Sequence, residues 1–331
     1  MDIELSHTLR GTKQNIWKDF LARAGLEADT NVEQTALVWD GDALIATGSR
    51  QGNLLKCIAV NPARQGEGLL AKVLTVLRQA AFQDGHRHLF LYTKPANAHL
   101  FSGLLFYPVA QTGDVLLMED KRSGIQDFLI NLAPVKHSGT VGSAVMNCDP
   151  FTLGHQYLIE TAAKTCDHLY VFVLSEDKAH FRAIDRMEMV KRGTAHLPNV
   201  TVLPTGPYLI SSATFPTYFL KNRDQAESIH CQLDVEIFAR YFAPAFGIHC
   251  RFVGTEPLSA MTDQYNEVLK ACLPQRGIDV VEIPRLVKGG APISASAVRQ
   301  IYARGDWTAL KNLVPTTTFE YLQTLQQEDS Q

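Results

Sequence analysis

The chain has 331 residues, of which 46% are hydrophobic and 20% are charged, the composition of an ordinary globular protein, and its length favours two domains. Its formal net charge of -3 excludes a general basic field, so we expect neither nucleic-acid nor membrane binding. With no apolar run long enough to span a bilayer, no segment resembling a signal peptide, and six cysteines without metal-ligand spacing, we expect a cytoplasmic protein with reduced thiols.

The segment 35–120 predicts a compact unit of strands and helices. Strands are expected on both sides of Asp40-Gly41-Asp42, because Asp-Gly is a strong hairpin-turn signal. A strand over 54–60 then leads through the glycine-containing turn 61–68 into a helix with apolar periodicity. An α+β domain is completed by this helix over 69–83, strands near 88–93, 105–110 and 114–119, and a short helix around 96–103.

A different rhythm begins near residue 138, where apolar strands alternate with helical segments. Because strands this apolar are each followed by a helix, they predict a parallel sheet covered on both faces. The stretch 120–139 is interpreted as a linker, so domains are expected over 1–125 and 126–331. The expected strands are 140–146, 168–175, 200–206, 247–254 and 278–284, and the expected helices begin at Gly154 and cover 182–195, 225–243 and 264–272.

The sequence Thr152-Leu153-Gly154-His155 lies where the first of these strands, ending near Cys148, turns into a helix. Open α/β sheets bind ligands at the carboxyl ends of their strands, and the N–H groups of a helix start attract anions. Gly154 leaves room for a phosphate to approach the backbone, while Thr152 and His155 can donate hydrogen bonds to it. The alternative is a threonine N-cap followed by a surface histidine. Cys148 is interpreted as a buried strand thiol.

A second possible anion site lies near the end of the chain, in the sequence Ile293-Ser294-Ala295-Ser296-Ala297-Val298-Arg299. Ser294 is a plausible N-cap, and Ser296 and Arg299 fall within the first turns of the helix that follows it. A serine-rich helix start with an arginine one turn inward suits a triphosphate. By itself this segment could equally be a well-capped helix.

Together the two motifs resemble the nucleotidyltransferase superfamily, whose members carry (H/T)xGH early and an ISSTxxR-like helix start late. Thr152 stands where many members have histidine. With the segments 175–193 and 252–270 between the motifs and an acetyltransferase-like domain in front, nearly the whole chain resembles the citrate lyase acetate ligase family. The resemblance implies an α/β protein whose Rossmann-like nucleotidyltransferase domain, with a parallel sheet, follows an α+β domain of GNAT type.

The resemblance also implies roles for particular residues. Thr152, Gly154 and His155 would hold the phosphates of ATP, with His155 facing the α-phosphate. Asn147, at the start of the same turn, is also assigned to the nucleotide site. Lys178 would screen the triphosphate or the acetate carboxylate, and Arg182 and Arg186 are weaker candidates for the triphosphate. Gly254 and Glu256 would lie near the adenine and ribose. The β- and γ-phosphates would be bound by Ser294, Ser296 and Arg299.

The reaction implied by the family joins acetate to a thiol. Acetate attacks the α-phosphate of ATP to give acetyl-adenylate and pyrophosphate, and the acetyl group then passes to the phosphoribosyl-dephospho-CoA prosthetic group of the citrate lyase acyl-carrier subunit, releasing AMP. Mg²⁺ is expected with the triphosphate, and no protein ligands for it are identified. Alternatives are an adenylyltransferase acting on a phosphopantetheine or mononucleotide, an acetyl-CoA-dependent acetyltransferase, and a carrier-docking module without enzymatic activity.

The first half resembles the acetyl-CoA motif of the GNAT superfamily, in which a strand feeds a glycine loop at a helix start. The loop here reads Gln65-Gly66-Glu67-Gly68-Leu69-Leu70, and it departs from the motif at Glu67 and Leu70. We therefore expect a GNAT-like fold without acetyltransferase turnover. Such a domain would either receive the CoA-like prosthetic group or serve only in structure and docking.

Overall fold

A computed structural model describes residues 1–132, 136–176, 179–211, 215–220, 225–255 and 260–328. The chain divides into two compact units, one of Met1–Gly124 with Pro216–Ile229 and the other of Ile125–Phe215 with His230–Gln331. No helix within the described ranges is both long and apolar enough to cross a membrane.

The first unit is an α+β domain built on a seven-stranded sheet in the order β1-β2-β3-β4-β5-β7-β6. All neighbouring strands are antiparallel except β4 and β5, which are parallel. Its elements are β1 (Asp2–Ser6), α1 (Gly11–Arg23), β2 (Gln34–Asp40), β3 (Ala43–Gln51), β4 (Leu54–Val60), η1 (Pro62–Arg64), α2 (Leu69–Gln83), β5 (Phe90–Thr93), η2 (Pro95–Asn97), α3 (Ala98–Ser102), β6 (Tyr107–Gln111) and β7 (Leu116–Glu119).

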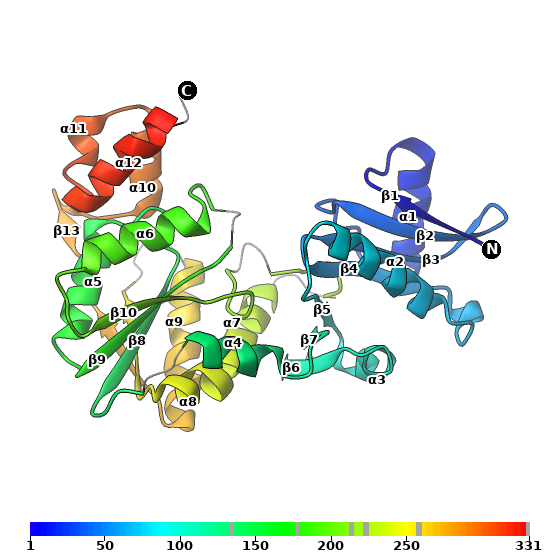
Figure 1. The fold of residues 1–331 in the computed structure, drawn as a ribbon, viewed down its shortest axis with the longest axis horizontal. Coiled ribbons are helices and arrows are strands. Elements are labelled where there is room, and N and C mark those ends of the chain that lie inside the picture. The colour runs from blue at the N-terminus through cyan, green and yellow to red at the C-terminus, as the bar shows by residue number, and fades with distance from the viewer. Residues whose placement is uncertain (133–135, 177–178, 212–214, 221–224, 256–259, 329–331) are drawn as a thin grey trace. The chain divides into compact units, whose positions relative to one another are not determined.

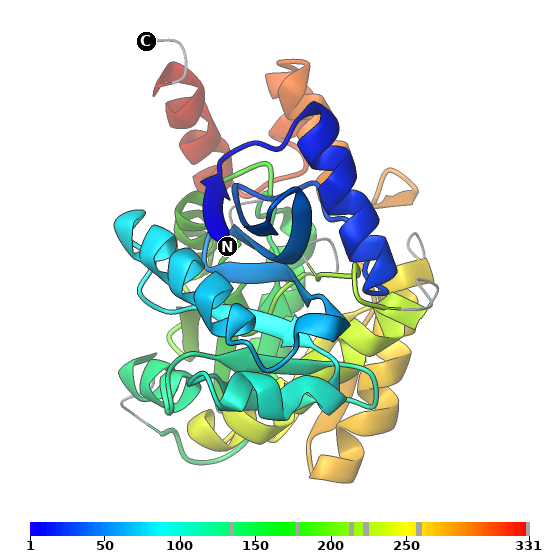
Figure 2. The same cartoon turned by 90° about the vertical axis from the view of Figure 1, so that its right-hand side faces the viewer.

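Helices cover both faces of this first sheet (Figure 2). Helix α2 packs closely on β3, because Gly48 has no side chain and a Cβ there would lie 2.6 Å from a methyl of Val73. The predicted strand, glycine turn and helix are confirmed, since β4 leads through η1 into α2, and Gly66 and Gly68 adopt φ of 86° and 72°. Positive φ favours glycine at both positions.

The second unit is built on a five-stranded parallel sheet in the order β10-β9-β8-β11-β12, as the alternating pattern predicts (Figure 1). Its strands are β8 (Val141–Met146), β9 (His168–Val173), β10 (Val200–Pro204), β11 (Cys250–Gly254) and β12 (Asp279–Ile283), with a small hairpin of β13 (Val287–Lys288) and β14 (Ala291–Pro292). Its helices are α4 (Gly124–Leu132), α5 (Leu153–Ala163), α6 (Ala183–Thr194), α7 (Ala226–Ile237), the π-helical η4 (Phe238–Phe242), α8 (Ala243–Phe246), α9 (Ala260–Cys272), η5 (Pro274–Arg276), α10 (Ala295–Ala303), α11 (Trp307–Leu310) and α12 (Thr316–Glu328). The start of α7, up to Ile229, groups with the first unit.

Both faces of the second sheet are buried. On one face a core of aliphatic and aromatic side chains joins strand residues such as Val171 to α5, α6 and the C-terminal helices α10 to α12, which gather near α6 in Figure 1. On the other face aromatic rings meet edge to face, with Phe172 contacting Phe242 and Phe246 at centroid distances of 5.3 and 5.1 Å. Covering on both faces explains why the strands are almost wholly apolar.

The predicted linker over 120–139 is wrong for its central part, because Gly124–Leu132 forms helix α4. Ile125 and Leu129, four residues apart, are both buried. That spacing places the two side chains on one helix face, so the segment has a packing surface that a linker lacks.

Candidate functional site

The sheet of the second unit opens between its central strands β8 and β11. These strands pair at Cys250 with Gly142 and at Arg251 with Ser143. From these pairs to the carboxyl ends of the two strands, the described residues of β8 and β11 do not pair with each other. The chain order also reverses here, because β8 continues to β9 on one side whereas β11 continues to β12 on the other. Such a switch point creates a crevice in which open α/β sheets bind ligands.

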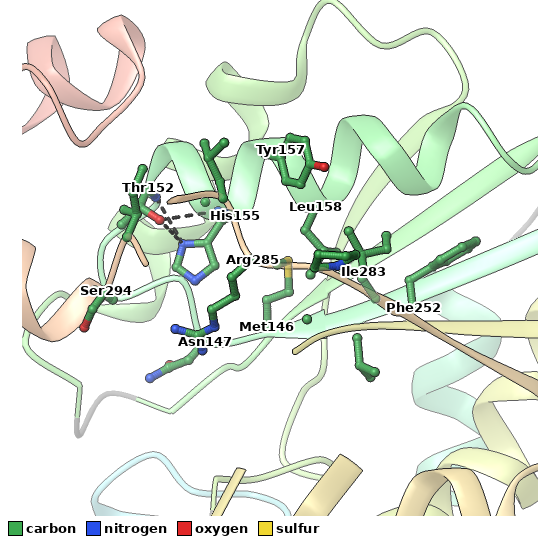
Figure 3. Close-up of a pocket in the computed structure, with 18 of the residues that line it drawn as sticks. Met146, Asn147, Thr152, His155, Tyr157, Leu158, Phe252, Ile283, Arg285 and Ser294 are labelled. Carbon is green, nitrogen blue, oxygen red and sulfur yellow. Dashed lines mark hydrogen bonds between the residues drawn. The ribbon is translucent and has the colours of Figure 1, made fainter. Parts of the chain in front are cut away.

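A pocket of about 630 Å³ occupies this crevice. It runs from the carboxyl ends of β8, β11 and β12 to the starts of helices α5 and α10 (Figure 3). The predicted residues Asn147, Thr152, Gly154, His155, Gly254, Ser294 and Ser296 all line it. The two motifs, which are about 140 residues apart in the sequence, therefore meet in one cavity.

The start of α5 is held by a reciprocal cap between Thr152 and His155. Thr152 is the N-cap, and its hydroxyl oxygen accepts a hydrogen bond from the backbone N–H of His155 at 3.3 Å. In return His155 Nδ1 accepts the backbone N–H of Thr152 at 3.1 Å. The threonine N-cap of the alternative interpretation thus exists, but His155 lines the pocket and the cap orients its imidazole ring.

The same hydrogen bond determines which nitrogen of His155 carries the proton. A backbone N–H can only donate, so Nδ1 is the acceptor and the neutral ring carries its proton on Nε2. Burial, with a smaller effect of the Arg285 charge, lowers the pKa of His155 to about 4. The ring is therefore neutral near pH 7, and its Nε2–H side points away from Thr152 into the pocket (Figure 3).

Gly154 is not required by the packing of the protein itself. An added Cβ would lie 3.5 Å from the carbonyl oxygen of Ile293 and from the hydroxyl oxygen of Thr152, which are ordinary contact distances. Its φ is not positive either. Gly254 differs, because a Cβ there would approach Leu158 to 3.2 Å.

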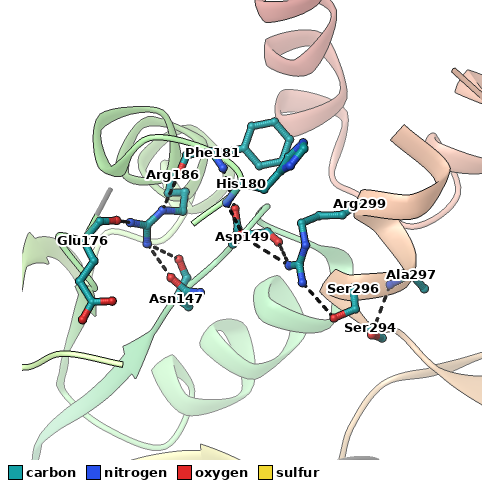
Figure 4. Close-up of polar contacts among 10 residues, drawn as sticks. All are labelled: Asn147, Asp149, Glu176, His180, Phe181, Arg186, Ser294, Ser296, Ala297 and Arg299. Carbon is teal, nitrogen blue, oxygen red and sulfur yellow. Dashed lines mark hydrogen bonds and ion pairs between the residues drawn. The ribbon is translucent and has the colours of Figure 1, made fainter. Parts of the chain in front are cut away.

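Ser294 and Arg299 lie on the second helix that faces the pocket. Ser294 is the N-cap of α10, as predicted, and accepts the N–H of Ala297 at 3.5 Å. Arg299 donates to Ser296 Oγ at 3.0 Å and forms an ion pair with Asp149 at 3.3 Å (Figure 4). Because Asp149 lies in the turn before α5, this ion pair links the two motifs directly.

Asp149 is itself fixed by backbone donors. Its carboxylate oxygens accept the N–H groups of His180 and Phe181 at 3.1 and 2.9 Å (Figure 4). The sequence analysis did not identify this residue, although an aspartate that follows a strand end is a recognisable signal.

Two other basic residues have structural partners. Arg186 is fully buried and donates to Asn147 at its carbonyl oxygen and at Oδ1, 2.8 and 2.7 Å away, so it holds the strand end that opens the site. Arg182 pairs with Asp185 at 2.7 Å. Lys178 and Glu256 lie outside the described residues. Cys148 is buried as expected, and burial raises the pKa of its thiol.

A family model described as citrate lyase ligase C-terminal domain matches residues 141–322, more than half of the chain. The chain belongs to the citrate lyase ligase family. It is 42% identical to a citrate pro-3S-lyase ligase of Klebsiella pneumoniae over 94% of this chain and 93% of that protein. The Escherichia coli K12 protein of the same name is 40% identical, over 94% of this chain and 91% of that protein.

A solved structure of Thermotoga maritima TmcAL bound with alpha-thio ATP covers 57% of this chain and 56% of that one, with 15% identity and a TM-score of 0.36. This likeness is too weak to carry an argument.

Arg285 is a further pocket residue that none of the sequence motifs contains. It directly follows Pro284 after β12, and its Nε donates to the carbonyl oxygen of Thr255 at 2.8 Å. Its side chain lies beside Asn147 and below the His155 ring in Figure 3. The signal that could have identified it is its position just after the end of a parallel strand.

Proposed function

We propose that this ligase activates acetate with ATP in the crevice of the second unit. An acetate oxygen bonds to the α-phosphorus as the bond from that phosphorus to the bridging oxygen of the β-phosphate breaks, so that pyrophosphate leaves and acetyl-adenylate forms. The sulfur of the prosthetic group on the citrate lyase acyl carrier, once deprotonated, then bonds to the acetyl carbon and AMP leaves.

The observation that carries this proposal is the neutral His155, held by Thr152 with its Nε2–H directed into the pocket. A hydrogen-bond donor fixed before the reaction can stabilise the charge that develops on the α-phosphate without reorganising. The starts of α5 and α10 supply further N–H donors, and Gly154 leaves the backbone accessible. Ser294 and Ser296 line the α10 end, where the pyrophosphate would leave with Arg299 close by.

Magnesium fits this site as a companion of the nucleotide. No described residue that lines the pocket is acidic, and the described part of the chain holds no cluster of three potential metal ligands. Mg²⁺ would therefore be held mainly by the triphosphate and water, where it supplies neutralising charge.

We propose that the first unit receives the CoA-like prosthetic group. A second pocket, of about 670 Å³, is lined by Gly66, Gly68 and Lys94 at the glycine loop and the end of β5. Glu67 does not oppose an anion there by itself, because Arg64 pairs with it at 2.6 Å. The loop therefore retains an accessible helix start for a pyrophosphate group.

The decisive experiment supplies ATP, ¹⁸O-labelled acetate and deacetylated citrate lyase. The proposal predicts acetyl thioester, pyrophosphate and AMP that carries one ¹⁸O, because an acetate oxygen remains on the phosphorus. A dinucleotide product would instead indicate the adenylyltransferase alternative, which the whole-length relatives do not favour. AMP without the label would refute attack by acetate on the α-phosphate.

A further inference from the structure

Arg251 lies at the inner end of the crevice, at the second of the two residue pairs that join β11 to β8. The residue is 1% exposed, yet it lines the pocket. Arg251 precedes Gly254 by three positions, so its Cα lies about 10 Å below the edge of the sheet that carries the helix starts. None of the roles proposed above uses this buried cation.

The guanidinium of Arg251 has hydrogen-bond donors without acceptors. Among the residues that the structure describes, neither Nε nor Nη1 has a hydrogen-bond partner. Nη2 lies 3.5 Å from the phenolic oxygen of Tyr265, at the outer limit of a hydrogen bond, and the ring of Phe238 covers the guanidinium at 4.4 Å. A buried cation with unpaired N–H groups is costly unless an anion completes it.

Among the hydrogen bonds of the described residues, the carboxylate of Asp234 is linked to Arg251 only through Tyr265. Tyr265 donates its hydroxyl hydrogen to Asp234 at 2.5 Å, so the phenol stands between the arginine and that carboxylate. Burial and the Asp234 charge raise the pKa of Tyr265 well above its usual value, which keeps the phenol protonated. Asp234 balances part of the charge from a distance, and Nε and Nη1 of Arg251 remain without an acceptor among the described residues.

We propose that Arg251 binds the carboxylate of the small acid that the enzyme activates. This inference rests on the proposed acid activation and adds the residue that recognises the acid. The planar guanidinium offers paired N–H donors that match the two oxygens of a carboxylate. Strand pairing at Cys250 and the Phe238 ring limit the depth of the site, which favours a short acid over a long one.

The test compares Arg251→Met, which removes the charge, with Arg251→Lys, which keeps the charge but loses the planar donors. Arg240→Met, at an exposed position in η4, is the matched control. At saturating ATP, the KM for acetate in acetate-dependent exchange of labelled pyrophosphate into ATP is expected to rise roughly 10- to 100-fold in Arg251→Met and less in Arg251→Lys. The Kd for ATP, measured by calorimetry without acetate, should stay within about twofold of wild type.

An unchanged KM for acetate in both variants would overturn the inference, as would an equal rise in the Kd for ATP, which would assign Arg251 to the nucleotide. If wild type shows no acetate-dependent exchange, it is the proposed function that fails. Wild type labelled with ¹⁵N-arginine then tests the site itself, because acetate should shift the Nε–H signal that Arg251→Lys removes. If Arg251→Met does not fold, this shift in wild type still tests whether acetate binds at Arg251. The absence of a shift on adding acetate would refute binding.

Discussion

Replacing Gly154 with alanine tests whether this glycine is needed for ligand binding or for folding. The new Cβ would meet the carbonyl oxygen of Ile293 at 3.5 Å and the Cβ of the same residue at 3.6 Å, so nothing in the protein has to move. Alanine also restricts the unfolded chain, which favours the folded helix by about 0.5–1 kcal/mol. The melting temperature should therefore stay equal or rise by about 1–3 °C.

The expected effect on catalysis is opposite in direction. A methyl group over the first turn of α5 would occupy the space in which a phosphate approaches the backbone N–H groups. A displacement of about 1 Å is enough to cost roughly 10²-fold in rate. We expect the turnover for pyrophosphate release to fall by about that factor and the KM for ATP to rise about tenfold.

Alanine substitutions at two other glycines serve as controls for the stability and rate measurements. Gly113→Ala meets no atom within 4 Å and should change neither stability nor rate. Gly193→Ala would place a methyl 2.3 Å from the ring of Phe151, so it should lower the melting temperature. The phosphate interpretation is refuted if Gly154→Ala leaves both turnover and the KM for ATP unchanged, or if it destabilises the protein as Gly193→Ala does.

Three further predictions concern His155 and Asp149. His155→Ala should lower turnover about 10²- to 10³-fold while the calorimetric Kd for ATP changes much less, and unchanged turnover would remove the central claim. Because the pKa of His155 is lowered to about 4, its neutral form stabilises the fold fully above the unfolded value near 6.5 and progressively less as pH falls from there toward 4. The difference in unfolding free energy between wild type and His155→Asn should accordingly narrow between pH 7 and pH 4 in urea titrations, and a constant difference would contradict the lowered pKa. Asp149→Asn weakens the ion pair that holds Arg299, so it should raise the KM for ATP by roughly 5- to 20-fold, whereas the exposed control Asp114→Asn should not.

Local rules were enough to predict the elements that carry the motifs. Strand and helix periodicity predicted the parallel sheet, and Ser294 caps α10 where its sequence context placed the helix start. The same reasoning failed at α4, where the stretch 120–139 was interpreted as a linker and the buried pair Ile125 and Leu129 was overlooked. It also gave no indication that Pro216–Ile229 groups with the first unit.

The sequence by itself determined the caps and helix starts that carry the two motifs, because these depend on residues a few positions apart. Only the tertiary structure decided which distant residues complete the site. Arg251, Arg285 and Asp149 come from different segments, and each looks ordinary in its own sequence context. They share one pocket or one ion-pair network because β8 and β11 separate where the chain order reverses. Strand order is set by packing across the whole sheet, so no local pattern could have placed a buried arginine at the bottom of that crevice.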